Sequence, residues 1–98
     1  MKKLNEISLY LKNKKQFFFS EFGVKNIVIF GSYVKGTASE TSDLDIAIEM
    51  AKEKKNLHNF LRFKRLLEKE LSLKVDIGIK ETLKDEVKKQ IVMDGIYV

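Results

Sequence analysis

The chain has 98 residues, of which 44% are hydrophobic, and a formal net charge of +5 from 19 Lys and Arg against 14 Asp and Glu. We expect one small domain over residues 1–98, because a chain of this length supports a single core. It contains no cysteine, which excludes disulfides and thiolate metal sites and is typical of a cytoplasmic protein. No segment approaches the ~18 apolar residues of a membrane span, and the dispersed lysines accompany no nucleic-acid-binding motif, so neither a membrane nor a nucleic acid is indicated as a partner.

The N-terminal third predicts a helix followed by a buried strand. Apolar residues recur at helical spacing over residues 3–21 and predict one amphipathic helix that ends near Gly23. The run Phe17–Phe19 cannot face one way on a helix, so one ring is expected to be partly exposed. Four consecutive apolar residues at the end of the segment 25–30 predict a strand covered on both faces, and therefore central in a sheet.

Two further strands are predicted on either side of a second helix. Strict alternation over residues 43–50 places Asp43, Asp45, Ala47 and Glu49 on one face and Leu44, Ile46, Ile48 and Met50 on the other. A second amphipathic helix is expected over roughly 54–71. The segment VDIGI, residues 75–79, predicts a third strand with Asp76 and Gly78 opposite its apolar residues.

The C-terminal segment predicts a last helix and a short tail. Thr82, with Asp85 three residues later, forms a pattern similar to a capping box at a helix start. This helix should end at Asp94–Gly95, and we expect the tail IYV to pair at a sheet edge.

Gly31 and Ser32 follow the predicted central strand, in a position suited to binding phosphate. If Ser32 opens a short helical turn through Lys35, free backbone N–H groups and the positive helix end face the mouth of the loop. Glycine permits close approach of a phosphate, and Gly36 allows the chain to turn back. The Ser32 hydroxyl would bind a phosphate oxygen or cap the turn, and these residues alone leave both interpretations open.

Three aspartates are predicted to share one face of the sheet. Asp43 and Asp45 are two residues apart on one strand, so their carboxylates project to the same side. Asp76 interrupts an apolar strand at a cost in strand propensity, which argues against the interpretation of the other two as a turn and a solvated residue. Three clustered carboxylates repel unless cations neutralise them. Oxygen ligands without His or Cys favour Mg²⁺ or Mn²⁺ over zinc.

The composite pattern Gly31-Ser32-x-x-x-Gly36, then Ser42-Asp43-x-Asp45, then Asp76 in a hydrophobic strand resembles the polymerase-beta-like nucleotidyltransferase superfamily. More narrowly, it resembles the minimal nucleotidyltransferase, or MNT, domain, and the likeness extends over essentially the whole chain. The resemblance implies an α+β fold, with a small mixed β-sheet and helices packed on one side.

The resemblance also implies roles for individual residues. Asp43 and Asp45 would hold two Mg²⁺ ions, and Asp76 would complete the catalytic site on the acceptor side. The triphosphate of ATP or another nucleoside triphosphate would be bound by Gly31, Ser32, Lys35, Gly36 and Ser42. Many family members carry Arg where Lys35 stands, and because lysine offers a point charge instead of a bidentate fork, weaker triphosphate binding or help from another cation is expected.

The implied reaction is attack by an acceptor hydroxyl on the α-phosphorus of a nucleoside triphosphate, which transfers the nucleoside monophosphate and releases pyrophosphate. Small MNT proteins are commonly antitoxins that neutralise a helical HEPN toxin by binding it and, in some systems, by transferring AMP to a toxin tyrosine. The resemblance therefore implies a HEPN toxin as partner. The sequence leaves the nucleotide, the acceptor and any homo-oligomer open.

Three alternatives are retained beside this hypothesis. The chain could modify a small molecule, as antibiotic nucleotidyltransferases do, although no acceptor-binding segment is visible. It could be a non-catalytic antitoxin that neutralises its partner by binding alone. A nucleic-acid polymerase fragment ranks last, because the basic residues are dispersed and no thumb or template channel is visible.

Overall fold

One mixed sheet organises the computed structural model, which describes residues 3–98. The strand order is β3-β2-β1-β4, with β1 antiparallel to both of its neighbours and β2 parallel to β3. The strands are β1 (Val24–Phe30), β2 (Leu44–Met50), β3 (Val75–Ile79) and β4 (Ile96–Tyr97). The predicted central position of β1 is confirmed, since it is paired on both edges and Ile27, Val28 and Ile29 are all buried. The predicted edge pairing of the tail is also confirmed, because β4 pairs with β1.

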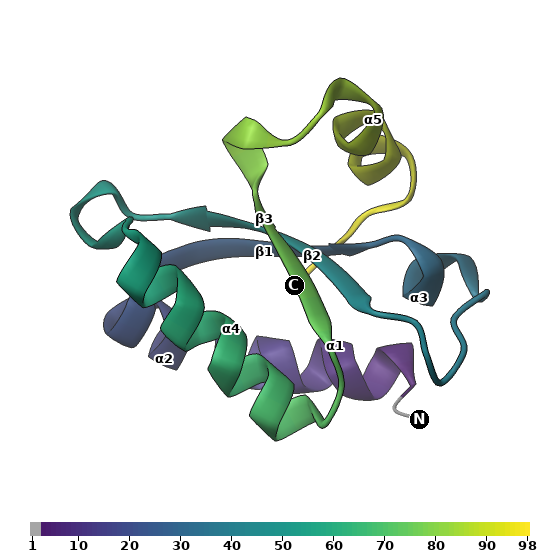
Figure 1. The fold of residues 1–98 in the computed structure, drawn as a ribbon, viewed down its shortest axis with the longest axis horizontal. Coiled ribbons are helices and arrows are strands. Elements are labelled where there is room, and N and C mark those ends of the chain that lie inside the picture. The colour runs from purple at the N-terminus through teal and green to yellow at the C-terminus, as the bar shows by residue number, and fades with distance from the viewer. Residues whose placement is uncertain (1–2) are drawn as a thin grey trace.

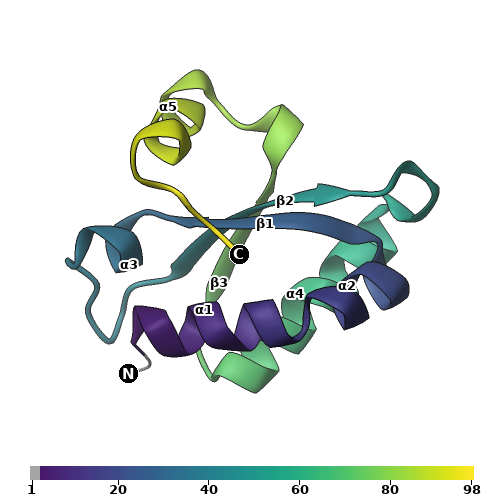
Figure 2. The ribbon, with the colours of Figure 1, turned by 180° about the vertical axis from the view of Figure 1, so that it is seen from behind.

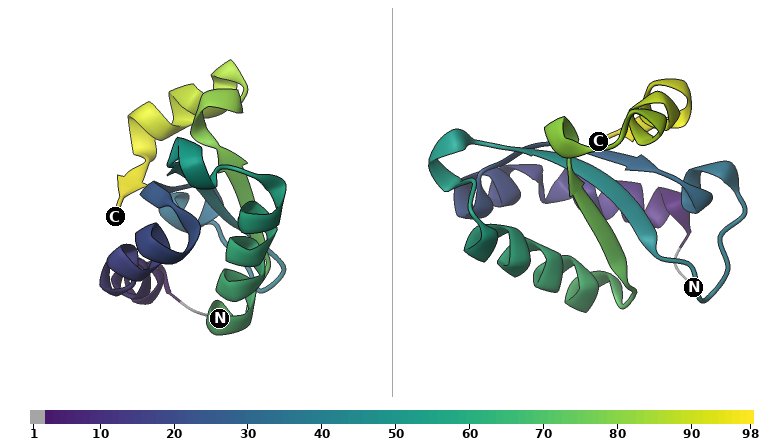
Figure 3. Two further views of the ribbon diagram at one scale, coloured as in Figure 1. Left: turned by 90° about the vertical axis from the view of Figure 1, so that its left-hand side faces the viewer. Right: turned by 45° about the horizontal axis from the view of Figure 1, so that its top comes forward.

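Helices cover both faces of this sheet. They are α1 (Leu4–Asn13), α2 (Lys15–Phe22), the single turn α3 (Ser32–Lys35), α4 (Leu57–Leu71) and α5 (Asp85–Asp94), with short 3₁₀ turns η1 (Lys52–Lys54) and η2 (Lys80–Thr82). Figures 1 and 2 show α1, α2 and α4 on one side of the sheet and α5 on the other. The α+β fold with a mixed sheet is therefore as expected. The packing of helices on one side holds for α1, α2 and α4, whereas α5 covers part of the opposite face (Figure 3).

The alternation of β2 explains this two-sided arrangement. Leu44, Ile46 and Ile48 are fully buried in the main core beneath α1, α2 and α4. Ala47 faces the other way and forms a small second cluster with Val28 of β1 and Ile91 of α5. This second cluster explains why α5 packs on the face opposite the main core, because the middle of that face is apolar and is buried by the helix. Nearer the beginning of β2, the same face carries the polar residue Asp45.

The single N-terminal helix predicted over residues 3–21 is wrong, because the structure has two helices. The chain bends at Lys14, whose backbone angles (φ −102°, ψ 2°) leave the helical range. The bend directs Phe18 and Phe22 of α2 towards Phe63 of α4, with ring centroids 5.0 and 5.6 Å apart. Aromatic packing across α2 and α4 thus accounts for a break that helical periodicity does not reveal.

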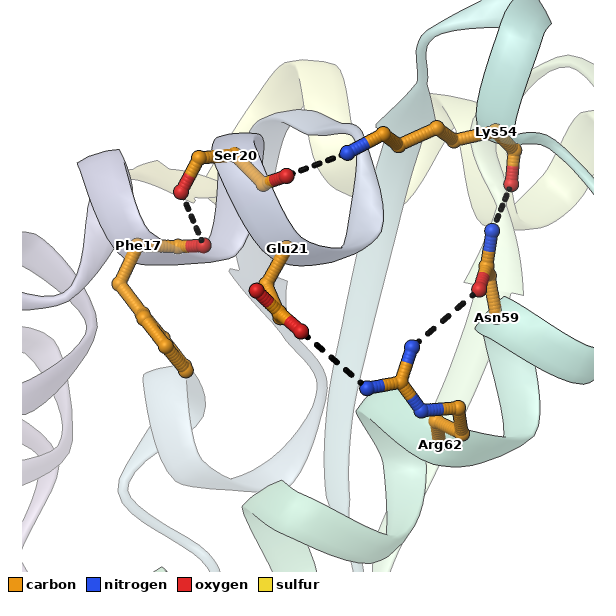
Figure 4. A network of polar contacts seen from close by, with 6 residues as sticks. All are labelled: Phe17, Ser20, Glu21, Lys54, Asn59 and Arg62. Carbon is orange, nitrogen blue, oxygen red and sulfur yellow. Dashed lines mark hydrogen bonds and ion pairs between the residues drawn. The ribbon is translucent and has the colours of Figure 1, made fainter.

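A polar network joins α2 to η1 and α4 at the surface of this aromatic cluster (Figure 4). The Lys54 ammonium donates to the carbonyl oxygen of Ser20, and the Asn59 amide donates to the Lys54 carbonyl at 2.9 Å. Arg62 contacts Asn59 and forms an ion pair with Glu21, each at 3.4 Å. A cation near the C-terminal end of α2 also offsets the negative end of the helix dipole.

Two predicted helix starts differ from the structure. The helix expected from about residue 54 begins at Leu57, because the Asn56 side chain accepts from the Asn59 N–H at 2.9 Å and caps it there. The proposed cap at Thr82 is wrong, since its hydroxyl donates to the Ile79 carbonyl at 3.0 Å and α5 starts only at Asp85. The predicted end at Asp94 is confirmed.

Within residues 3–98, every helix is too short or too polar to cross a bilayer.

Candidate active site

The strand register brings two of the three predicted aspartates side by side. Asp45 of β2 lies directly opposite Asp76 of β3, and Phe30 of β1 is the neighbour of Asp45 on its other edge. Adjacent strands are about 4.8 Å apart, so the two side chains share one face at neighbouring positions. Asp43 lies just before β2 and is exposed. All three carboxylates therefore lie around the beginnings of β2 and β3.

Gly31 lies directly against the carboxylate of Asp45. Its backbone angles (φ 78°, ψ −150°) are accessible only to glycine, and any Cβ at this position would collide with Asp45 Oδ2. The sharp turn that ends β1 thus places the predicted phosphate loop in contact with the predicted carboxylate site. No sequence pattern specified this contact.

Substitution of Gly31 by alanine tests this close approach. The expected result is displacement of the Asp45 carboxylate and a loss of about 1–3 kcal/mol of stability from backbone strain and steric conflict. The rate of the nucleotidyl transfer that the sequence resemblance implies should fall at least ~100-fold. Unfolding in urea and a rate assay measure both effects.

Gly36→Ala is the matched comparison for this substitution. Gly36 also has a positive φ of 75°, but a Cβ there would meet no atom within 4 Å. Strain without collision should cost about 1 kcal/mol and leave the Asp45 carboxylate in place. Equal losses of stability in the two variants would contradict the contact between Gly31 and Asp45.

The turn α3 carries the remaining predicted phosphate-binding groups. The Gly31 carbonyl accepts from the N–H groups of Val34 and Lys35, both at 3.1 Å, which closes the turn. No side chain caps the start of α3, so the interpretation of Ser32 as a cap is not supported. Ser32 is partly exposed and Lys35 is exposed. Both side chains are therefore accessible to a ligand.

Ser42 has a visible structural partner within its own loop. Its hydroxyl accepts from the Ser39 N–H at 2.9 Å, and its N–H donates to the Ser39 carbonyl at 3.1 Å. These bonds fold residues 39–42 into a turn that leads directly to Asp43. The contact of Ser42 with the nucleotide, which the family resemblance implies, remains a prediction.

The electrostatics of Asp45 show that the three carboxylates interact. Burial raises the pKa of Asp45 above its usual 3.8, and the neighbouring charges of Asp76 and then Asp43 raise it further. Each cause disfavours the ionised form. A ligand that brings positive charge to this face would relieve that repulsion.

The carboxylates are coupled without forming a closed metal cage. Among residues 3–98, no three His, Cys, Asp or Glu side chains converge closely enough to hold an ion as they stand. Mutual repulsion of like charges opposes such convergence. The donor set nevertheless fits a hard divalent cation, because Asp43, Asp45 and Asp76 offer only carboxylate oxygens.

Sequence reasoning missed several residues that border this site. Ser72, Leu73 and Lys74 form the turn between α4 and β3, and they line a pocket together with Glu40 and Thr41 of the loop before β2. The only signal was the position of these residues immediately before Asp76, since no motif distinguishes them.

Comparison with known proteins shows the family to which this fold belongs. A family model of the nucleotidyltransferase domain matches residues 11–98. The protein adenylyltransferase MntA of Thermococcus cleftensis is 38% identical over 97% of this chain and 95% of its own length. A solved structure provisionally described as a minimal nucleotidyltransferase is 25% identical, with a TM-score of 0.79 over 97% of this chain and 95% of its own. A toxin–antitoxin complex crystallised with AMP-PNP is 25% identical, with a TM-score of 0.69 over 88% of this chain and 70% of its own.

The fold and these likenesses define a nucleotidyltransferase. The chain belongs to the nucleotidyltransferase domain family, as one of its minimal, MNT-type members. The family resemblance recognised in the sequence is thereby confirmed.

Proposed function

We propose that this nucleotidyltransferase moves AMP from ATP to a tyrosine hydroxyl of a helical HEPN toxin and so acts as an antitoxin. The relative from Thermococcus cleftensis is named a protein adenylyltransferase, and the toxin–antitoxin neighbour was crystallised with the ATP analogue AMP-PNP. Both support ATP as donor and a protein as acceptor. The HEPN class and the tyrosine follow from the resemblance to MNT antitoxins.

The observation that carries the proposal is the junction of Gly31, Asp45 and Asp76. The register pairs the two aspartates, and the turn at Gly31 presses against one of them. A triphosphate held by the loop would therefore have its α-phosphorus beside the carboxylates. This is the geometry that nucleotidyl transfer needs, because positioning supplies much of the rate in phosphoryl chemistry.

The chain's own groups account for the transfer as follows. The backbone around Gly31, the Ser32 hydroxyl and the Lys35 ammonium bind the triphosphate. The acceptor oxygen forms a bond to the α-phosphorus while the bond from that phosphorus to the bridging oxygen of the β-phosphate breaks, and pyrophosphate leaves. Asp76 takes the acceptor proton or passes it to solvent. Mg²⁺ held by Asp43, Asp45 and Asp76 would supply positive charge that offsets charge developing on the phosphate oxygens.

A labelling experiment tests this function directly. The chain is incubated with Mg²⁺ and a purified HEPN protein that forms a complex with it, in parallel with ATP labelled at the α- or the γ-phosphate. We expect the partner to acquire label from α-labelled ATP only, because AMP transfer discards the γ-phosphate. Neutralised toxin without label would instead indicate a non-catalytic antitoxin, and label on an added small molecule would indicate an antibiotic-type enzyme.

A further inference from the structure

A pocket of about 390 Å³ opens beside Asp43, within the usual size range of ligand sites. It lies between the loop that leads into β2 and the turn that leads into β3, both visible in Figure 1. Its lining residues are Glu40, Thr41, Ser42, Asp43, Ser72, Leu73 and Lys74. One wall is the candidate catalytic carboxylate Asp43, so a side chain that enters the pocket lies beside one member of the carboxylate site.

Hydrogen bonds hold both walls of this pocket in place. The Lys74 carbonyl accepts from the Leu44 N–H at 2.9 Å, and the Glu68 carboxylate accepts from the Val75 N–H at 3.0 Å. The turn also holds Ser72 in the left-handed region at φ 54°, the only non-glycine residue with a positive φ among residues 3–98. Such backbone strain persists only where the surrounding structure enforces it. The pocket is therefore a preformed feature.

The sheet order places one wall of this pocket, the turn at Ser72–Lys74, across β2 from the phosphate loop. Gly31 ends β1, the two aspartates of the D-x-D motif begin β2, and the turn at Ser72–Lys74 precedes β3 on the far side. An in-line displacement requires the acceptor oxygen to approach opposite the leaving pyrophosphate. With the triphosphate at Gly31, the acceptor must approach from the β3 side.

We propose that this pocket receives the acceptor tyrosine of the partner protein, an assignment that rests on the proposed function. Partly buried Leu73 gives the pocket an apolar wall, while hydroxyl and charged groups line its rim. A phenol suits this combination, because its ring is apolar and its oxygen is polar. At the Asp43 end the phenolic oxygen gains AMP, its proton leaves to a carboxylate or to solvent, and pyrophosphate departs on the other side.

Filling the pocket tests the assignment without touching the carboxylates. In Thr41→Trp the indole should occupy the acceptor space. Thr82→Trp is the matched control, because Thr82 lies outside the pocket lining. Both threonines are exposed, and the hydroxyl of each makes one local contact. We expect Thr41→Trp to lower kcat/KM for the HEPN protein at least 10-fold, while the Kd for AMP-PNP stays within about twofold. The control should change neither. Wild-type transfer by Thr41→Trp, or an equal loss of AMP-PNP affinity, would overturn the pocket assignment.

A second measurement is independent of catalysis, so it separates this inference from the proposed function. A photoreactive benzoylphenylalanine at position 41 is irradiated in the complex with the HEPN protein, and the cross-linked peptide is sequenced. Capture of a tyrosine-containing segment from position 41, and not from position 82, supports the pocket even if the wild type transfers no label. Capture elsewhere, or no capture from a complex that forms, rules it out.

Discussion

Replacement of Asp45 by asparagine is expected to abolish the proposed AMP transfer while leaving the fold intact. Asp45 is paired with Asp76 across the strands and its carboxylate contacts the turn at Gly31. Asp45 therefore links the proposed carboxylate site to the proposed phosphate loop. Loss of its charge should reduce the rate at least ~1000-fold, equivalent to roughly 4 kcal/mol of transition-state stabilisation. Single-turnover transfer of α-labelled AMP to the partner measures this loss.

The same substitution is expected to make the folded protein more stable at neutral pH. Burial and the neighbouring carboxylates raise the pKa of Asp45 in the folded state above the ordinary value of 3.8. A carboxyl with a raised folded pKa destabilises the fold wherever it is ionised, so the penalty is complete at pH 7 and vanishes as the pH falls through the folded pKa towards 3.8. Because Asp45 is partly exposed, solvent screening limits the gain to about 1 kcal/mol. The corresponding rise in Tm is at most ~4–8 °C.

Glu49→Gln is the matched control for Asp45→Asn. Glu49 lies on the same strand and face, four residues away, and its carboxylate accepts from the Asn26 amide at 2.7 Å. We expect this variant to transfer AMP at the wild-type rate.

The stability difference between wild type and Asp45→Asn should narrow as the pH is lowered from 7 to 4. A constant difference across that range, or near-normal transfer by Asp45→Asn, would show that Asp45 has been misassigned.

Phe18→Ala should cause the largest loss of stability. The ring is fully buried and packs edge-on against Phe63 of α4 at 5.0 Å, with Tyr10 of α1 at 6.1 Å. Truncation of a buried phenylalanine leaves a cavity and typically costs about 3–5 kcal/mol. A domain of this size has only about 5–15 kcal/mol in total. Urea unfolding followed by circular dichroism measures the change.

Phe19→Ala provides the comparison, because Phe18 and Phe19 are adjacent residues of the same type in α2. Phe19 is 53% exposed, so its loss should change the free energy of unfolding by less than about 0.5 kcal/mol. If the two variants lost similar stability, α2 would have to be rotated about its axis relative to the sheet.

The three-phenylalanine run shows how far the sequence predicts the core. Spacing on a helix indicated that one ring would be partly exposed, and in the structure two are: Phe17 at 43% and Phe19 at 53%. Helical periodicity could not reveal the bend at Lys14, because the bend serves contacts with α4, which is remote in sequence. The side on which α5 packs was hidden for the same reason, since it depends on an apolar patch formed jointly by β1 and β2.

Two-residue alternation correctly predicted the sheet face on which the candidate site residues of β2 and β3 lie. The alternation of β2 and β3 placed Asp45 and Asp76 opposite the core, and the structure confirms both positions. Their direct pairing could not be predicted, because parallel register depends on how α4 returns the chain to the sheet. The contact between Gly31 and Asp45 was hidden for a similar reason, since it depends on how β1 and β2 pair.

The parallel pairing of β2 with β3 also has a consequence for folding kinetics. Asp45 and Asp76 become neighbours only when β3 docks on β2, and the chain between these two strands contains the whole of α4. Contacts between segments so distant in the chain form slowly, because loop closure costs entropy before any pairing repays it. A chain with its helices formed but β3 undocked would hold Asp43 and Asp45 without Asp76 beside them. Recovery of transfer activity during refolding, which needs Asp76, would therefore mark the docking of β3, later than the recovery of helical signal.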